Sequence, residues 1–371
     1  MSISAERGRS GKGTLGPLRQ DGRRAIYSAR LAKNASERNT RAASPVTSRG
    51  TAQIFLGDAL ELYPRWPRPT VIISDGPYGL GSYPGDPPTV EGLTGFYAPH
   101  VRAWSEYALP STTLWFWNSE LGWATVHPLL LRYGWEYRNC HIWNKGKAHV
   151  AGNANSKTLR KFPVVTEVCV QYVRQVRLPA PAASQPLPLK QWLRYEWERS
   201  GLPLYRANEA CGVANAATRK YLTKCHLWYF PPGEAFERLV AYANRLGDPE
   251  GRPYFAPDGK HPLTRTQWEQ MRAKFDCLFG INNVWSVPPV SGTERIKHQS
   301  APVHLNQKPL SLMDLILNAS SNPRDAVWEP FGGTCTAVVA CLKTGRRGFG
   351  AEIIPEYYEI AVERLQTALS G

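Results

Sequence analysis

Several features are missing from this sequence of 371 residues, and each absence narrows what the chain can be. It has no apolar run of about 20 residues, so we expect no membrane span. Its N-terminus lacks the apolar segment of a secretory signal peptide, which favours a cytoplasmic protein. The seven cysteines are scattered and form no CxxC pair, which argues against a disulfide framework and a zinc site. No metal site is predicted.

Acidic residues are few: 45 Lys and Arg face 30 Asp and Glu, a net charge of +15. Residues 1–50 carry eleven basic and three acidic residues, which gives this segment +8. The excess raises the expectation of a polyanionic partner. A segment this rich in Ser, Gly and Arg buries little apolar surface, so 1–50 is predicted to be a disordered basic tail.

Hydrophobic patterning predicts strands alternating with helices before residue 178 and again after residue 280. Such alternation is typical of an α/β domain with a parallel sheet. The Pro-rich stretch 178–190 reads as a linker or a domain edge, and helical and loop signals dominate from there to about residue 280. We therefore expect one α/β domain, built from 51–177 and 281–371, with a mostly helical module inserted at 178–280.

A glycine turn follows one predicted strand in AVWEPFGGTCTAVVA. The strand is expected to end at Glu329, the chain to turn through Gly332 and Gly333, and a helix to begin near Thr334. The next strand ends at Glu352, whose carboxylate is placed to accept hydrogen bonds from ribose hydroxyls. GxGxxG and GxxxxGK[ST] are absent, which disfavours nicotinamide and triphosphate ligands. A cofactor with ribose and adenine but no phosphate fits, namely S-adenosylmethionine.

A second strand, VIIS, runs into Asp75, Gly76, Pro77 and Tyr78. Ligands bind at strand carboxyl ends in open α/β sheets. Asp75 and a carbonyl near Gly76 or Pro77 could accept hydrogen bonds from an exocyclic amine, and Tyr78 could stack on its base. The base must then be flipped out of the duplex. A strand followed by an ordinary Asp-Gly turn is the alternative.

Together these segments resemble the beta class of amino DNA methyltransferases. That family has a D/N/S-P-P-Y/F/W motif early, here DGPY, and DPFxGxGT late, here EPFGGTCT. HLNQKPLSLMDLIL and FLGDALELY resemble two further family segments, beside the methionine and adenine parts of the cofactor. The resemblance covers about 52–175 and 281–368.

The resemblance implies a Rossmann-like, S-adenosylmethionine-dependent methyltransferase sheet with an inserted target-recognition module. It assigns the catalytic role to Asp75, Gly76, Pro77 and Tyr78. The cofactor site would be lined by Asp58, Ala59, Asn306, Lys308, Glu329, Phe331, Gly332, Gly333, Thr334 and Glu352. For Lys308, a solvated lysine before a helix is the alternative.

Within the module, residues 203–222 resemble a helix-turn-helix, although a plain helical hairpin is an equal alternative. Its second helix would present Asn215, Thr218, Arg219 and Lys220 to DNA. Arg160 and Lys161, in NSKTLRKFP, could hold phosphates or lie on a solvated loop.

We expect methylation of adenine N6, because the cytosine-N4 members of the family more often carry Ser where Asp75 stands. Double-stranded DNA is the expected partner, with a cognate restriction endonuclease and a homodimer as further predictions. The alternatives are cytosine N4, RNA or a protein amide as substrate, and a non-catalytic DNA-binding protein. The last is suggested by Gly76 in place of Pro and by Cys335, whose sulfur is expected near the cofactor.

Overall fold

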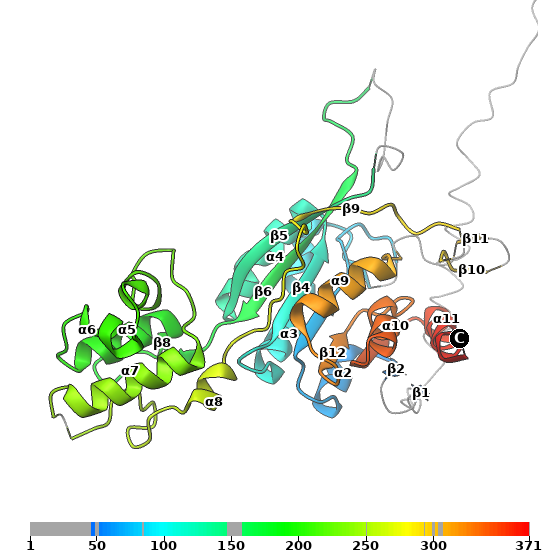
Figure 1. The fold of residues 1–371 in the computed structure, drawn as a ribbon. Coiled ribbons are helices and arrows are strands. Elements are labelled where there is room, and N and C mark those ends of the chain that lie inside the picture. The colour runs from blue at the N-terminus through cyan, green and yellow to red at the C-terminus, as the bar shows by residue number, and fades with distance from the viewer. Residues whose placement is uncertain are drawn as a thin grey trace, which may run out of the picture.

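The computed structural model describes residues 46–48, 52–83, 85–146, 158–249, 251–292, 294–298, 301–302 and 307–370. In this part of the chain nine strands form one sheet in the order β1-β2-β13-β12-β3-β4-β6-β5-β9 (Figure 1). The strands are β1 Val46–Ser48, β2 Ala52–Leu56, β3 Val71–Ser74, β4 Thr113–Asn118, β5 Trp135–Asn144, β6 Thr166–Arg174, β9 Val284–Ser286, β12 Ala326–Glu329 and β13 Arg347–Glu352.

Helices cover both faces of this sheet. They are α2 Ala59–Leu62, α3 Leu93–Tyr107, α4 Glu120–Arg132, α9 Leu310–Ser320, α10 Thr336–Lys343 and α11 Pro355–Ser370, with 3-10 turns η1 Tyr63–Arg65 and η2 Val90–Gly92. Successive residues of β3 point to opposite faces: Ile72 packs in the cluster that contains Trp104 of α3, whereas Ile73 packs in the cluster that contains Ile316 of α9. Burial on both faces explains why β3 and β4 are apolar at nearly every position.

The sheet is mixed, and the expectation of a parallel sheet is corrected by β6. This strand pairs antiparallel with both β4 and β5, because the chain reverses after β5 and runs back between the two. The α/β fold itself is as predicted. At the N-terminal side, Val46–Ser48 pairs with β2 as an edge strand, so the predicted tail ends earlier than residue 50. The rest of that tail lies outside the described residues.

The middle segment has its own hydrophobic core, in which Trp192, Trp197, Phe236 and Trp268 are fully buried. Its elements are β7 Arg177–Leu178, β8 Leu187–Pro188, α5 Leu189–Arg199, α6 Arg206–Cys211, the π-helical turn η3 Ala217–Tyr221, α7 Gly233–Leu246 and α8 Arg265–Glu269. The Pro-rich stretch is therefore a small hairpin, β7–β8, rather than an open linker. After the module, β10 Lys297–His298 pairs with β11 Ala301–Pro302.

The segment in which a helix-turn-helix or a helical hairpin is predicted has a short second half. Gly212 makes the left-handed turn after α6, but η3 is a single π-helical turn of five residues. Asn208 explains the tight geometry, because its side chain accepts from the Thr218 amide (3.1 Å) and donates to the Thr218 hydroxyl (3.2 Å). Thr218 thus joins the two segments, and the helix-turn-helix stays a prediction.

The module and the β5–β6 connection lie at opposite ends of the same strand pair (Figure 1). Asn144, at the end of β5, pairs with Thr166, where β6 begins. Trp135 pairs with Arg174 at the other end, and the module follows directly from there. The chain returns from the module to β9, which runs parallel to β5 and pairs with its last residues, Ile142–Asn144, at the end that faces the β5–β6 connection.

No helix of the described residues is long and apolar enough to cross a membrane. The seven cysteines, all of which the structure describes, are free thiols. In the same residues no group of three or more His, Cys, Asp or Glu side chains could hold a metal ion.

Candidate active site

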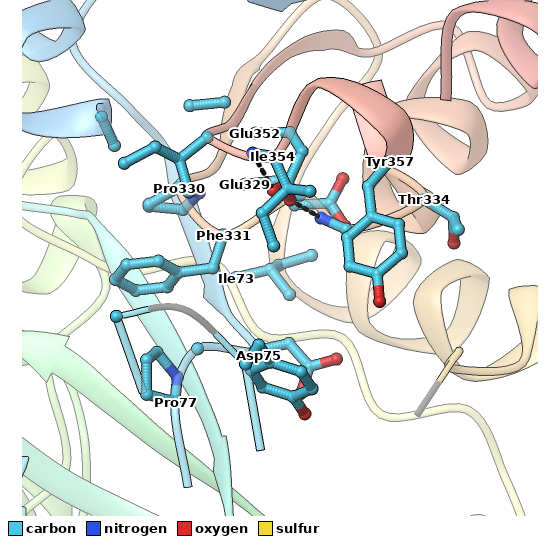
Figure 2. A pocket seen from close by; sticks show the side chains of 18 of the residues that line it. Ile73, Asp75, Pro77, Glu329, Pro330, Phe331, Thr334, Glu352, Ile354 and Tyr357 are labelled. Atoms are coloured by element: carbon cyan, nitrogen blue, oxygen red, sulfur yellow. Dashed lines mark hydrogen bonds between the residues drawn. The ribbon is translucent and has the colours of Figure 1, made fainter. Parts of the chain in front are cut away.

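The two predicted motifs meet because their strands are neighbours. β3 and β12 pair in parallel, so Asp75, directly after β3, and Phe331, just after β12, emerge at the same sheet edge. Figure 2 shows Asp75 and Pro77 on one side of a pocket and Glu352 on the other. Predicted site residues that line this pocket are Asp58, Ala59, Asp75, Gly76, Pro77, Tyr78, Lys308, Glu329, Phe331, Gly332, Gly333, Thr334 and Glu352. Asn306 lies outside the described residues.

Lys308 is buried and binds the Asp75 carboxylate directly. Its ammonium donates to Asp75 Oδ1 at 2.7 Å and Oδ2 at 2.8 Å, and its side chain is only 2% exposed. The solvated alternative for Lys308 is therefore excluded. Burial opposes the charge, but Asp75 and Glu167 together hold the pKa of Lys308 above its usual value. The ammonium is thus a permanent part of the site.

Burial raises the pKa of Asp75, and the Lys308 ammonium only partly offsets that effect. The Tyr78 hydroxyl lies 3.1 Å from Asp75 Oδ1 and 3.1 Å from Glu167 Oε2. The pKa of Tyr78 is raised well above its usual value, mainly by burial and also by the negative charges of Glu167 and Asp75. The phenol therefore stays neutral. Asp75 is consequently a carboxylate in a mostly dry environment, where its acceptor strength is increased.

Gly76 is required by its neighbours. A Cβ at this position would lie 2.5 Å from Tyr97 Oη and 2.6 Å from the Phe331 ring. The next carbonyl, that of Pro77, already accepts from Tyr97 Oη at 3.1 Å and from Asn118 Nδ2 at 3.0 Å. Gly76 stands where the family usually has Pro, and the Tyr97 and Phe331 side chains fill the space that a larger residue would need.

Glu329 holds the glycine turn in place. Its two oxygens accept from the amides of Ala337 (3.1 Å) and Val338 (2.8 Å), in the first turn of α10. Burial raises the pKa of Glu329 to about 7, against the opposing effect of these amides. The side chain lines the pocket, but its hydrogen bonds serve the start of α10, which otherwise has no side-chain cap.

Glu352 is placed at the end of β13 and faces the same turn. It accepts from the Gly333 amide at 2.6 Å and from the Ile354 amide at 2.7 Å (Figure 2). Burial raises the pKa of Glu352 to about 7. Each carboxylate oxygen can accept a second hydrogen bond, so both remain able to bind hydroxyl groups. Asp58 similarly caps α2 through Leu60 N (2.9 Å) while lining the pocket.

The Cys335 sulfur, which is expected near the cofactor, does not line the pocket among the described residues. Cys335 is fully buried in the cluster that contains Ala52, Ile54 and Val338, on the side of α10 that packs against β2. The residue adopts a left-handed conformation with φ of 50°, which turns its side chain inward. Gly332 leaves room for that sulfur, because a Cβ on Gly332 would lie 2.5 Å from it.

The candidate DNA-binding residues fall into two separate places. Arg160 and Lys161 are exposed on the β5–β6 connection, at the strand ends that face the pocket edge of the sheet. Arg219, Lys220 and Asn215 are exposed on the module, beyond the opposite ends of those strands. The structure does not bring these two groups together, and it ties Thr218 to Asn208 instead of leaving it free for DNA.

Several pocket residues escaped the sequence reasoning. Tyr357 and Ile354 follow Glu352 and line the pocket on the side shown in Figure 2. Asp86 accepts from the amides of Gly79 (2.9 Å) and Ser82 (2.9 Å) and thereby shapes the loop that follows Tyr78. Glu167 was missed as well: it contacts Tyr78 and Lys308 without lining the pocket itself, and a charge near the start of a mostly buried strand was a usable signal.

The pocket is acidic, which restricts its ligand. Among the lining residues that the structure describes, five are Asp or Glu and one, Lys308, is Lys or Arg. Among the lining residues that the structure describes, Lys308 is the one Lys or Arg and it is bound to Asp75, so this part of the lining offers no further Lys or Arg to a phosphate group. Acceptors at Glu352 and Asp58 suit hydroxyl and amino donors, and negative charge suits a sulfonium. The donor set therefore fits S-adenosylmethionine and disfavours nucleotide phosphates.

Comparison with known proteins adds independent findings. A family model described as DNA methylase, and named for N6 and N4 methyltransferases, matches residues 70–363. The DNA adenine methyltransferase YhdJ of Escherichia coli is 38% identical over 86 residues, 23% of this chain and 28% of that protein. The type II methyltransferase M.HinfI of Haemophilus influenzae is 38% identical over 85 residues, 23% of this chain and 24% of that protein.

A solved structure of an M1.HpyAVI–SAM complex has a TM-score of 0.45 and 16% identity, and covers 84% of this chain and 98% of its own. The two curated relatives are matched over only about a quarter of their length.

Proposed function

Because this chain belongs to the DNA methylase family whose model matches residues 70–363, we propose that it transfers a methyl group from S-adenosylmethionine to the exocyclic amine of a DNA base, adenine N6 by preference. The observation that carries the proposal is the meeting of Asp75 and the Phe331–Thr334 turn in one acidic pocket. The preference for adenine rests on Asp at residue 75.

S-adenosylmethionine, when bound, supplies a methyl group activated by a sulfonium. Glu352 would hold the ribose hydroxyls, and Asp58 and Ala59 would lie beside the adenine. The turn through Gly332 and Gly333 lets the backbone approach the ligand closely. Thr334 and Phe331 complete the lining between these residues and Asp75.

The chemistry of the amine is assigned to Asp75 and Gly76. An exocyclic amine delocalises its lone pair into the ring and is a weak nucleophile. When Asp75 and a backbone carbonyl accept its two N–H groups, the lone pair becomes more available. Since the Pro77 carbonyl already accepts two donors, the Gly76 carbonyl is the backbone acceptor in this proposal.

Tyr78 is proposed to stack on the flipped base. Its hydroxyl is anchored on Asp75 and Glu167, which fixes the ring beside the catalytic carboxylate. Arg160 and Lys161 are proposed to hold phosphates of double-stranded DNA, because they lie at the sheet edge where the pocket opens. Target recognition by the module at 178–280, a cognate restriction endonuclease and a homodimer remain proposals from the resemblance.

Methyl incorporation with isotopically labelled S-adenosylmethionine tests the function. Duplex DNA, structured RNA and a protein extract are offered in parallel, and hydrolysed DNA is searched for N6-methyladenine and N4-methylcytosine. We expect label in N6-methyladenine and its loss with Asp75→Asn. Label confined to RNA or protein would overturn the DNA proposal, and label in N4-methylcytosine would overturn the preference for adenine.

A further inference from the structure

Glu167, the second residue of β6, contacts two groups of the candidate active site and a neighbouring lysine. Its Oε2 lies 3.1 Å from the Tyr78 hydroxyl and 3.4 Å from the Lys308 ammonium, and its Oε1 accepts from Lys145. The side chain is 12% exposed, so these interactions are weakly screened by water. Glu167 itself does not line the pocket among the residues described there, so it can act only through its neighbours.

The cluster is balanced in charge, with two ammonium groups and two carboxylates. Aromatic rings hold the ammonium groups from the side: Lys308 Nζ lies 5.5 Å from the Tyr78 ring and 5.4 Å from that of Trp117, and Lys145 Nζ lies 4.8 Å from the Trp143 ring. Lys145 and Lys308 together hold the pKa of Glu167 below its usual value despite its burial. Glu167 is therefore a fixed negative charge beside Lys308.

The two oxygens of Asp75 differ in their remaining capacity. Oδ1 is approached by both the Lys308 ammonium and the Tyr78 hydroxyl, whereas Oδ2 is approached by Lys308. Because a carboxylate oxygen accepts about two hydrogen bonds, Oδ2 keeps the capacity to bind an amine N–H. The positions of Lys308 and Tyr78 decide which oxygen remains available.

We infer that Glu167 is a positioning residue for methyl transfer: it shares the Lys308 ammonium with Asp75 and holds the Tyr78 hydroxyl, and so leaves Asp75 Oδ2 a stronger hydrogen-bond acceptor for the amine. This inference rests on the proposed function. Without the charge of Glu167, Lys308 would be neutralised by Asp75 alone and would draw electron density from it. The Tyr78 hydroxyl would also donate to Asp75 alone, which would weaken the carboxylate further as an acceptor.

The variant Glu167→Gln tests this inference, with Glu136→Gln as its matched control. Glu136 lies on β5, pairs with Arg138 at 3.2 Å and has a side chain 44% exposed, away from the pocket. The first measurement is a ¹³C-carboxyl NMR titration of Asp75, assigned by loss of its signal in Asp75→Asn. Glu167 raises the pKa of Asp75 by charge repulsion, so Glu167→Gln lowers it and Glu136→Gln leaves it unchanged.

The second measurement is the single-turnover rate at saturating S-adenosylmethionine. Glu167→Gln is expected to lower this rate by up to about 100-fold, the effect of a displaced catalytic group. The cofactor Kd, measured by calorimetry, stays within a factor of about three because Glu167 does not reach the pocket. Glu167→Asp restores the charge at a shorter reach and is expected to recover the Asp75 titration in part.

An unchanged Asp75 titration in both Glu167 variants overturns the inference, as does a rate equal to that of Glu136→Gln. The carboxyl titration does not depend on turnover, so it reports on Glu167 even where the wild-type chain methylates nothing. A wild-type chain that methylates nothing would overturn only the proposed function.

Discussion

Asp75 and Lys308 are 233 residues apart in the chain, yet the ammonium of Lys308 lies within 2.8 Å of both Asp75 oxygens. This ion pair joins the strand end after β3 to the segment that leads into α9. It links the proposed catalytic carboxylate to the segment that resembles the family's methionine-binding motif. A displacement of that segment would therefore move the Lys308 ammonium relative to the Asp75 carboxylate.

Asp75→Asn should abolish most methyl transfer while cofactor still binds. The amide keeps the size of the side chain but cannot present two acceptor oxygens, and it leaves Lys308 without its main counter-charge. We expect the single-turnover rate to fall by about 100- to 1,000-fold, as for removal of one preorganised hydrogen-bonding group. Radiolabel transfer measures the rate and calorimetry the cofactor affinity; a variant of near wild-type rate contradicts the role of Asp75.

Gly76→Ala should destabilise the protein, because the added methyl group would lie 2.5 Å from Tyr97 Oη and 2.6 Å from Phe331. The expected decrease is about 1–3 kcal/mol in the free energy of unfolding. Gly95→Ala is the control: a Cβ there meets nothing within 4 Å, and alanine in α3 should stabilise by up to about 1 kcal/mol. Urea unfolding followed by circular dichroism compares the two variants. Equal free energies of unfolding would mean that the Gly76 site can accommodate a methyl group.

Cys335→Ala should leave the cofactor site intact. The sulfur packs against Ile54 and Val338, so its removal is expected to cost about 1 kcal/mol of unfolding free energy. The affinity for S-adenosylmethionine should change by less than about a factor of three. Urea unfolding measures the stability of the purified variant, and calorimetry measures its affinity. A large change in affinity would place the sulfur against the cofactor after all.

Cofactor affinity should rise with pH around neutrality. The pKa of Glu352 is about 7 in the free protein, so the carboxylate is largely protonated at pH 6 and ionised at pH 8. Only the ionised form favours a cationic ligand, and binding must therefore release a proton below pH 7. We expect affinity to be up to about tenfold higher at pH 8 than at pH 6.

Calorimetry in two buffers of different ionisation enthalpy would detect that proton. Glu352→Gln is expected to bind weakly at both pH values and to show no proton release. A Glu352→Gln variant that keeps the wild-type pH dependence would assign the effect to another group, of which Glu329 is the nearest in pKa.

Replacing Arg160 and Lys161 should weaken DNA binding uniformly across sequences. The slope of log affinity against log salt falls by about one for each phosphate that a basic side chain no longer neutralises, so the double glutamine variant should show a slope smaller by up to about two. Arg219→Gln combined with Lys220→Gln is the comparison, because those residues lie at the far strand ends. Fluorescence anisotropy over a salt series measures the slope for both double variants. A reduced slope only in the Arg219 and Lys220 variant would show that the module, and not the β5–β6 connection, contacts the phosphates.

The sequence predicted the family, which the family match confirms, and it predicted the two strand ends that form the pocket. These succeed because Asp75 and the glycine turn are local signals placed directly after apolar strands. The direction of β6 and the partner of Lys308 were beyond reach, since they depend on contacts between distant segments. The burial of Cys335 and the π-helical η3 were not predicted, because the first depends on one left-handed residue and the second on the contact between Asn208 and Thr218.

The module begins directly after β6, at the strand end remote from the pocket, and the returning chain pairs with the last residues of β5 as β9. The catalytic sheet therefore has a strand of its own on each side of the insertion, and residues 178–280 belong to neither strand. In a chain built this way, residues 178–280 can be lengthened, shortened or replaced while the catalytic residues keep their positions. Selectivity and reactivity can then diverge separately, so relatives with similar catalytic halves can differ completely in the middle of the chain.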